Sequence, residues 1–369
     1  MRLLHFADLH LDTRFRWASP QQARNRRRAL RETLMHICQV ADEQRVDALT
    51  CGGDLYEQER FTPDTAEFLR ATFAEIAPLP VFLAPGNHDW FGPVSLYRQI
   101  QWSPNVHVFD TAELSAIGLA DGLTLWGAAH CAPANTPGFL DAFHVDRGGV
   151  HLALFHGSAQ GDLWMQQKGK VPHAPFRVEQ IERSGLHHAL LGHFHHPVEA
   201  SDYTYPGNPD TLSFGETWKG AAVLVTVGGD GAISREHFAV ATSIVSDVSV
   251  DLTGVTHEGQ VRERVLDAVD DLSGYVRVTL RGALGPDVDV RLQDFEQLCP
   301  ANLDALVVQF GSVRVALSDD YETLRKEQTV RGQFVHDVLG ADLTDNQRHR
   351  VLVTGLRALN DRIDDLEVH

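Results

Sequence analysis

Five short polar motifs, each at the end of an apolar run, constrain the fold of this chain most strongly. The clearest is the turn Pro85-Gly86-Asn87-His88-Asp89, which follows an apolar run at residues 81–84. Gly86 can adopt backbone angles that other residues resist, and Pro85 cannot continue a strand, so the turn is expected to leave a sheet. The other motifs are Asp8-Leu9-His10, Gly53-Asp54, His156-Gly157 and Gly192-His193-Phe194-His195. Strand ends that carry only Asp, Asn and His predict a metal-centred site at the edge of a sheet.

Strands and long helices alternate over the first 90 residues of the chain. Apolar residues predict a buried strand at residues 2–7, a helix from about residue 21 to 45 that starts after Ser19-Pro20, and a second strand at Asp47–Cys51. This alternation is typical of a parallel sheet. Further short strands follow to about residue 240. We therefore expect an α/β fold, a four-layer α/β/β/α sandwich of two sheets face to face with helices outside.

The length of the chain predicts more than one domain. A chain of 369 residues is too long for one ordinary core, and the character of the sequence changes near residue 244. We predict a first domain at residues 1–243, a smaller α+β domain at 244–320 and a helical tail at 321–369. Residues 306–310 and 313–317 are expected to form two separate short strands, and a long helix is expected to end the chain.

Composition argues against several classes of protein. No apolar run approaches the roughly 20 residues needed to cross a bilayer, so no membrane partner is expected. The first residues lead directly into a strand, which argues against a signal peptide. The four cysteines are scattered without paired spacing, which disfavours a disulfide framework or a zinc ribbon and is typical of a reducing compartment. A cytoplasmic location is the resulting expectation.

One segment of this acidic chain is strongly basic. The net charge of −18 disfavours a nucleic-acid partner, yet residues 14–31 hold seven arginines and no acidic residue. A solvated helix face and a surface that contacts phosphates are two open interpretations of this segment. Trp90 lies just past the Asn-His-Asp turn, and two interpretations of it stay open: packing in the core and stacking on an unpaired base. The candidate DNA contacts are Arg14, Arg16, Arg24, Arg27, Arg28 and Trp90.

The polar motifs supply the ligand types of a site for two divalent metal ions. Two such ions, about 3.5–4 Å apart, can hold a phosphate and stabilise its attacking and leaving oxygens. Alternate side chains of an extended segment point to one side, so both members of Asp-x-His and of His-x-His can reach one centre. Imidazole combined with carboxylate favours manganese, iron or zinc, and the absence of thiolates disfavours a structural zinc site. The candidate ligands are Asp8, His10, Asp54, Asn87, His156, His193 and His195.

The five motifs, in this order, resemble the signature of the calcineurin-like metallophosphoesterases over roughly residues 1–240. The resemblance implies two metal ions, most suitably Mn²⁺, with Fe²⁺ or Zn²⁺ as alternatives, and Asp54 as the ligand that bridges them. The implied ligands are Asp8, His10, Asp54 and His195 for one ion and Asp54, Asn87, His156 and His193 for the other. His88 would be no ligand. It would face the scissile phosphate, to stabilise its charge or to protonate the leaving oxygen, with Asp89 orienting its ring.

Finer details resemble the SbcD-type DNA repair exonucleases, the bacterial counterparts of the meiotic-recombination nuclease. The opening RLLHFADLHLD, the phrase DALTCGGDLYE and the loop Tyr205-Pro206-Gly207-Asn208-Pro209 carry this likeness. The C-terminal part, including TVRGQF at residues 329–334, is more similar to the YhaO-like branch. Members of this group often carry a His three residues after the bridging Asp, where this chain has Glu57.

The resemblance implies a manganese-dependent DNA exonuclease or endonuclease of DNA repair. Residues 244–320 would be a capping domain that recognises DNA, and residues 321–369 would dock on an SbcC-like, SMC-type ATPase. A homodimer through the helices after Pro63 and Pro93 is implied as well. Two other classes stay open: a metallophosphoesterase that acts on small phosphodiesters, and a non-catalytic scaffold that recruits a partner.

Other histidines are expected to be strand or surface residues, because none of them completes a motif. They include His5, His130, His144, His151, His187, His188 and His196.

Overall fold

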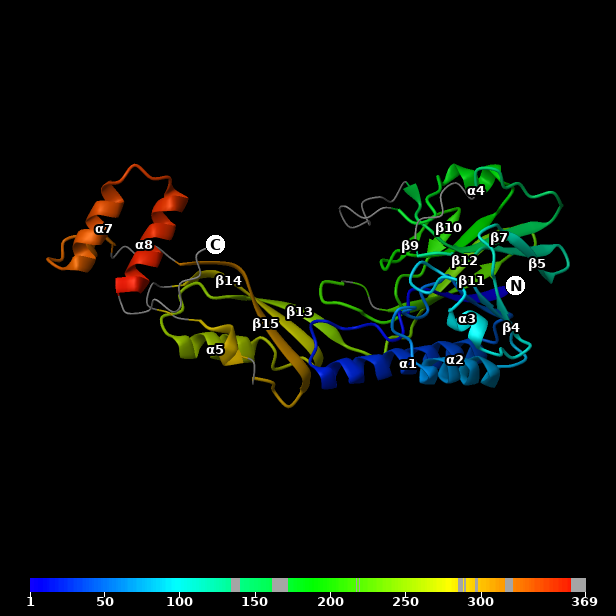
Figure 1. The fold of residues 1–369 in the computed structure, drawn as a ribbon, viewed down its shortest axis with the longest axis horizontal. Helices are drawn as coiled ribbons and strands as arrows, with labels where there is room; N and C mark the ends of the chain where they lie inside the picture. The colour runs from blue at the N-terminus through cyan, green and yellow to red at the C-terminus, as the bar shows by residue number, and fades with distance from the viewer. Residues whose placement is uncertain are drawn as a thin grey trace. The chain divides into compact units, whose positions relative to one another are not determined.

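A computed structural model of the chain describes residues 1–133, 140–160, 172–216, 218, 220–284, 288, 290–295, 298–315 and 321–359. Contacts between residues divide the chain into two compact units, Met1–Ile244 and Val245–His369. Figure 1 shows the elements of both units coloured along the chain, from blue at the N-terminus to red at the C-terminus. Each unit has its own sheet structure and its own apolar core.

Within its described residues, the first unit contains two six-stranded sheets. The strand orders are β12-β11-β1-β2-β3-β4 and β5-β6-β7-β8-β10-β9. The strands are β1 (Arg2–Phe6), β2 (Ala48–Cys51), β3 (Val81–Leu83), β4 (Val106–Val108), β5 (Ser115–Ala120), β6 (Leu123–Gly127), β7 (Val150–His156), β8 (His188–Gly192), β9 (Val198–Glu199), β10 (Tyr203–Tyr205), β11 (Ala221–Val227) and β12 (Ile233–Ala239). The helices described in this unit are α1 (Pro20–Glu43), α2 (Pro63–Glu75), α3 (Leu96–Gln99) and α4 (Glu179–Arg183).

Parallel pairing places several strand ends at the same edge of each sheet. β1, β2, β3 and β4 pair in parallel in that order. In the second sheet, β6, β7 and β8 pair in parallel. A chain that returns to a parallel neighbour needs a long crossover, and α1 and α2 supply it between the first three strands.

Helix α1 starts where the sequence predicts it. The side chain of Ser19 accepts a hydrogen bond from the backbone N–H of Gln22, whose own side chain accepts one from the backbone of Ser19. This reciprocal cap satisfies two N–H groups that a helix start otherwise leaves unpaired, and Pro20 occupies the first helical turn.

Alternate apolar residues of the strands build the layers of the first unit. Leu4 of β1 belongs to the cluster that α1 and α2 complete. Leu3, on the opposite face of β1, clusters with Leu152 of β7 in the layer between the sheets. On the other side of β7, Phe155 clusters with Ile181 of α4. The first unit is therefore the four-layer α/β/β/α sandwich expected from the sequence.

The part of the second unit that the structure describes contains one three-stranded sheet, in the order β13-β14-β15, with parallel pairing throughout. Its described elements are β13 (Val245–Asp251), α5 (Glu258–Asp267), β14 (Gly274–Leu284), the 3₁₀ helix η2 (Leu292–Phe295), β15 (Leu303–Val315), α6 (Tyr321–Leu324), α7 (Val330–Gly340) and α8 (Asp345–Leu359). α5 packs on the sheet in one apolar cluster, and α6, α7 and α8 share another. The predicted last helix corresponds to α8, and its expected end lies outside the described residues. Among the described helices of the whole chain, none has the length and apolar character needed to cross a membrane.

The expectation of two short strands at residues 306–310 and 313–317 is wrong, because Leu303–Val315 forms one strand. Its partner β14 pairs on both sides of Gly311, with Leu280 opposite Phe310 and Gly282 opposite Val313. A register shift between Leu280 and Gly282 accommodates the extra residue, so the strand does not need to break. Residues 316 and 317 lie outside the described part of the chain.

Candidate metal centre

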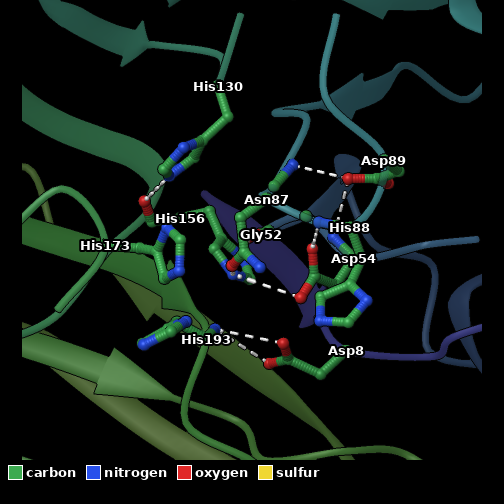
Figure 2. A network of polar contacts seen from close by, with 12 residues as sticks. Asp8, Gly52, Asp54, Asn87, His88, Asp89, His130, His156, His173 and His193 are labelled. Carbon is green, nitrogen blue, oxygen red and sulfur yellow. Dashed lines mark hydrogen bonds and ion pairs between the residues drawn. The ribbon is translucent and has the colours of Figure 1, made fainter. Parts of the chain in front are cut away.

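The candidate metal ligands lie at or just after the carboxyl ends of strands β1, β2, β3, β7 and β8. In strand order they are Asp8 and His10, then Asp54, then Asn87, then His156, then His193 and His195. Because β1 to β3 are parallel, and β7 and β8 are parallel, each sheet delivers its polar residues at one edge. Figure 2 shows side chains from both sheets gathered around one centre.

Four of these residues adopt a left-handed backbone conformation, which is uncommon for a residue with a side chain. The φ angles are 56° at Asp8, 51° at His10, 52° at Asp54 and 113° at His193. Each such conformation costs of order 1–3 kcal/mol and persists where the surroundings enforce it. Backbone hydrogen bonds do so here, from Asp8 N to the carbonyl of Gly53 and from His10 N to the carbonyl of Asp54, both 2.9 Å. Four of the eight described non-glycine residues with positive φ are thus candidate ligands.

The two sheets come into backbone contact beside this centre, at Gly52 and Gly192. A Cβ atom on Gly52 would stand 2.8 Å from the backbone nitrogen of Gly192, and one on Gly192 would collide with the carbonyl oxygen of Gly52. Both positions therefore require glycine. This contact holds together the two segments that carry Asp54, two residues after Gly52, and His193, which follows Gly192.

One group of donor atoms joins Asp8, His10 and His195. Their ligand atoms lie within 4.8 Å of one another, and the Nε2 atoms of His10 and His195 are 3.2 Å apart. Burial lowers the pKa of His195 to about 3, so its ring is neutral at ordinary pH. A neutral imidazole is the form that binds a metal ion.

A second group joins Asp8, Asp54 and His156, again within 4.8 Å. Nε2 of His156 lies 3.3 Å from Oδ2 of Asp54 and 3.0 Å from Oδ1 of Asn87. Burial lowers the pKa of His156, but the charges of Asp54 and Asp8 and the hydrogen bonds to Asp54 and to the carbonyl of Gly52 together outweigh it and raise the pKa to about 9. A metal ion that binds here displaces this proton, so metal binding and proton release are coupled.

His193 stands beside these groups. Its backbone N–H donates to both carboxylate oxygens of Asp8, at 3.1 and 3.0 Å, and its ring centroid lies 5.2 Å from that of His156. Its ring belongs to none of the three groups of donor atoms found among the described residues, the third being His10, Glu57 and His88. The structure thus joins six of the predicted ligand side chains in one cluster and places the seventh next to it.

The donor set fits divalent metal ions. Asp8 and Asp54 are 0% and 2% exposed, and burial raises the pKa of Asp8 to about 6. Two neighbouring buried carboxylates need cationic partners, because charge in a buried site is costly unless it is paired. Oδ2 of Asp54 also lies 3.6 Å from Nε2 of His10, so this carboxylate contacts both groups. That is the position a bridging ligand needs.

His88 lies at the edge of the centre, and 45% of its side chain is exposed. Its Nδ1 is 3.1 Å from Oε2 of Glu57, whose other oxygen is 2.8 Å from Nδ1 of His10. Burial raises the pKa of Glu57, but hydrogen bonds from His10 and His88 outweigh it and lower the pKa to about 2. Because a carboxylate only accepts hydrogen bonds, both rings carry hydrogen on Nδ1 and present Nε2 elsewhere.

The expectation that Asp89 orients the ring of His88 needs correction, because Glu57 makes that contact. Asp89 is fully buried and accepts hydrogen bonds from the backbone N–H groups of Gly86, Asp54 and Leu55, at 2.6, 3.1 and 2.7 Å. The hydroxyl of Tyr97 donates to it at 2.6 Å. Both oxygens of Asp89 are therefore occupied in holding the turn after β3 to the loop after β2.

Sequence reasoning missed Glu57 as a partner of His10 and His88, and it missed His173 altogether. The ring of His173 lies 5.5 Å from that of His193, and its backbone N–H donates to Oγ of Ser158 at 3.2 Å. The position of Glu57, three residues after the implied bridging ligand Asp54, was a sequence signal that could have identified it. His173 has no motif around it, so only the fold reveals its position.

The arginines of residues 14–31 divide between surface and core. Arg14, Arg16, Arg24 and Arg28 are exposed, and Arg27 is half-buried, as is Trp90. Arg26 is fully buried, with a guanidinium nitrogen 3.3 Å from Oδ1 of Asp210. Arg26 therefore holds α1 to the loop that contains Asp210, and it is not part of any surface for phosphates.

Comparisons with known proteins connect the first unit to one family. A family model described as calcineurin-like phosphoesterase matches residues 1–197, which include all five motifs. The uncharacterized metallophosphoesterase YhaO of Bacillus subtilis (strain 168) is 26% identical over 287 residues, covering 74% of this chain and 68% of that protein. The structure of TT1561 of Thermus thermophilus is 13% identical with a TM-score of 0.39, covering 64% of this chain and 98% of that one. The structure of YfcE, a phosphoesterase from E. coli, is 14% identical with a TM-score of 0.30, covering 65% and 100%.

Proposed function

From the premise that the chain belongs to the calcineurin-like phosphoesterase family, we propose that it is a two-metal phosphodiesterase that cleaves DNA. The position of Asp54 supports the binding of two metal ions. Its Oδ2 atom lies 3.6 Å from Nε2 of His10 and 3.3 Å from Nε2 of His156, and these two histidines belong to different groups of donor atoms. Two ions bound there would polarise the phosphate and stabilise its attacking and leaving oxygens. Imidazole with carboxylate favours Mn²⁺, with Fe²⁺ and Zn²⁺ as alternatives.

His88 is the proposed acid of the reaction. Burial lowers its pKa, but the charges of Asp54 and Glu57 outweigh it and raise the pKa to about 9. In the metal-free protein the ring therefore keeps a proton on Nε2 at neutral pH while Nδ1 donates to Glu57. From this exposed position Nε2–H would stabilise charge on the phosphate and donate its proton to the leaving oxygen.

Exposed arginines support DNA as the substrate. Arg14 and Arg16 follow the ligand His10 by four and six residues, and Arg24 and Arg28 extend the basic segment along α1. Arginine forks bind phosphate oxygens without regard to sequence, as a nuclease that acts on ends or single strands requires. Trp90, which is half-buried and two residues after His88, would stack on an unpaired base.

The second unit is proposed to bind a protein partner. Residues 245–369 hold 13 basic and 23 acidic residues, a balance that repels DNA and suits docking on another protein. On this proposal residues 244–320 are the capping domain, and residues 321–369 dock on an SbcC-like, SMC-type ATPase in the cytoplasm. Helices α2 and α3 would form a homodimer contact.

The test uses the purified full chain with Mn²⁺, a labelled DNA that has single-stranded and blunt ends, and bis-p-nitrophenyl phosphate. Asp54→Asn serves as the inactive variant. Asp121→Asn, an exposed residue in the turn between β5 and β6, is the matched control. Metal-dependent cutting of both substrates by wild type and the control, but not by Asp54→Asn, is the expected result.

Two other results would contradict parts of the proposal. Hydrolysis of the small diester with intact DNA, also after addition of the ATPase partner, would reject DNA in favour of small phosphodiesters. No hydrolysis of either substrate by a chain that has bound two Mn²⁺ ions would reject the phosphodiesterase and favour a scaffold.

A further inference from the structure

His130 lies in the loop after β6, and its backbone holds both ends of the turn that carries Asn87 and His88. Its N–H donates to the carbonyl of Pro85 at 2.9 Å, and its carbonyl accepts from the N–H of Phe91 at 2.7 Å. The turn after β3 is therefore attached on both sides to one residue of another segment.

The side chain of His130 contacts the end of β7, the neighbour of β6 in the second sheet. Its Nε2 lies 2.9 Å from the carbonyl oxygen of His156, the last residue of β7 (Figure 2). A carbonyl only accepts, so Nε2 carries the hydrogen. One residue thus binds the turn of Asn87 through its backbone and the strand end of His156 through its ring.

Asn87 and His156 are two ligands of the same implied metal site, and they come from different sheets. Their side chains meet at 3.0 Å, between Oδ1 of Asn87 and Nε2 of His156. A second hydrogen bond, 2.9 Å from Nδ1 of His156 to the carbonyl of Gly52, sets the plane of the His156 ring. The distance between Asn87 and His156 then depends on how the turn and the strand end are held together.

His130 also carries a cost that a merely space-filling residue would avoid. It is 3% exposed, and its Nδ1 has no hydrogen-bond partner among the described residues. An unpaired buried polar atom costs about 1–3 kcal/mol. Two other buried histidines, His5 and His188, have both ring nitrogens within hydrogen-bonding distance of a partner.

We propose that His130 is a positioning residue for the second metal site, because it fixes the turn of Asn87 relative to the strand end of His156. The inference rests on the proposed two-metal function. It assigns His130 no contact with substrate or metal. Its effect is on the second equivalent of metal, while the site of Asp8, His10 and His195 is left intact.

The test compares three substitutions of His130 by metal binding, measured by calorimetry with Mn²⁺ on the metal-free full chain. His130→Leu keeps the volume and removes the donor, and the small side chains of Ala112, Ala128 and Ala174 next to His130 leave room for it. His130→Gln places an amide nitrogen near the Nε2 position, and His130→Asn places one too close to the backbone to reach His156. His188→Leu is the control for loss of a buried histidine away from the centre.

The expected result is a split between the two equivalents of Mn²⁺. His130→Leu and His130→Asn bind the second equivalent about 10–100-fold more weakly and the first as in wild type, as losses of such supporting contacts do. His130→Gln restores the second equivalent. His188→Leu lowers the melting temperature but leaves both affinities unchanged.

The proposal is overturned if His130→Leu binds both equivalents as wild type does, or if it weakens both equally. If His130→Leu does not fold, His130→Asn decides by the same criteria. Wild-type protein that binds fewer than two Mn²⁺ ions would instead reject the two-metal function on which the inference depends. Because calorimetry needs no substrate, neither result depends on whether DNA is cut.

Discussion

The carboxylate of Glu57 accepts a hydrogen bond from Nδ1 of His88 at 3.1 Å while its other oxygen accepts one from Nδ1 of His10 at 2.8 Å. One acidic side chain thus fixes the ring of an implied metal ligand and the ring of the proposed acid. The two rings stand edge to face, with centroids 4.8 Å apart.

Glu57→Gln tests this shared contact. A glutamine has one accepting oxygen, so it can satisfy only one of the two Nδ1–H groups, and its amide opposes the other. We expect kcat on bis-p-nitrophenyl phosphate to fall about 10–100-fold, with weaker binding of the metal that His10 holds. Glu59→Gln, an exposed neighbour, is the matched control. A Glu57→Gln protein with wild-type kcat and metal affinity would show that the contact has no role.

His88→Ala separates chemistry from metal binding. The backbone N–H of His88 donates to Oδ1 of Asp54 at 2.8 Å, and this contact survives any side-chain substitution. Metal content should therefore stay at the wild-type value while turnover falls about 10²–10⁴-fold. The loss should be larger on DNA than on bis-p-nitrophenyl phosphate, whose leaving group needs no proton. His144→Ala, at an exposed position, is the control. Equal losses on both substrates would argue against proton donation.

Asp54→Asn tests the bridging position. Asparagine keeps the shape of the side chain but removes the charge that contacts both groups of donors. Both equivalents of Mn²⁺ should be lost in a metal titration. In the metal-free protein the pKa of His156, now without that charge, should fall from about 9, which histidine NMR signals followed against pH would report. Retention of both metal ions would refute the bridge.

Buried neutral histidines make the fold sensitive to acid. Burial and the charge of Arg235 lower the pKa of His188 to about 3, against 6.5 for an unperturbed histidine. Between these values the unfolded chain binds one more proton, so stability is lost as pH falls below about 6.5. His188 alone then removes about 2 kcal/mol of stability between pH 7 and pH 5, at 1.36 kcal/mol for each pKa unit. Urea unfolding of metal-free protein should show this loss.

The matched variant for that pH series is His188→Gln, which cannot be protonated. Its stability should fall less steeply with acid than that of wild type, by about one proton in the slope. Curves that stay parallel from pH 7 to pH 5 would mean that the pKa of His188 is the same in the folded and the unfolded chain.

The sequence was sufficient to predict the layers of the first unit and the strand ends that supply the site. The reason is that these features depend on residues close together in the sequence. Asp8, Asp54 and Asn87 each follow an apolar run that predicts a strand. Parallel order then implies that these ends share one edge. The capped start of α1 at Ser19 was equally local.

Contacts made by neighbouring polar residues could not be predicted in the same way. Asp89 follows His88 directly and was expected to orient it, whereas Glu57, 31 positions away in the chain, makes the contact. Which carboxylate reaches the ring of His88 depends on the left-handed turn at Asp54, where φ is 52°. No residue pattern in the sequence predicts that angle. His130 and His173 lie in segments without a motif, so their positions depend on the packing of two sheets.

The contact between Gly52 and Gly192 has a consequence for how this unit can change. The separation of the two sheets at the centre is limited by main-chain atoms in contact, because a single methyl group on either glycine would collide with the opposite strand. Substitutions in the apolar layer between the sheets, at residues such as Leu152 or Leu190, would then alter the free energy of unfolding more than the spacing of the ligands. Substitutions in this scaffold can therefore change thermal stability without changing the geometry of the metal ligands. Gly52 and Gly192 are the exceptions, because a substitution at either one would change both.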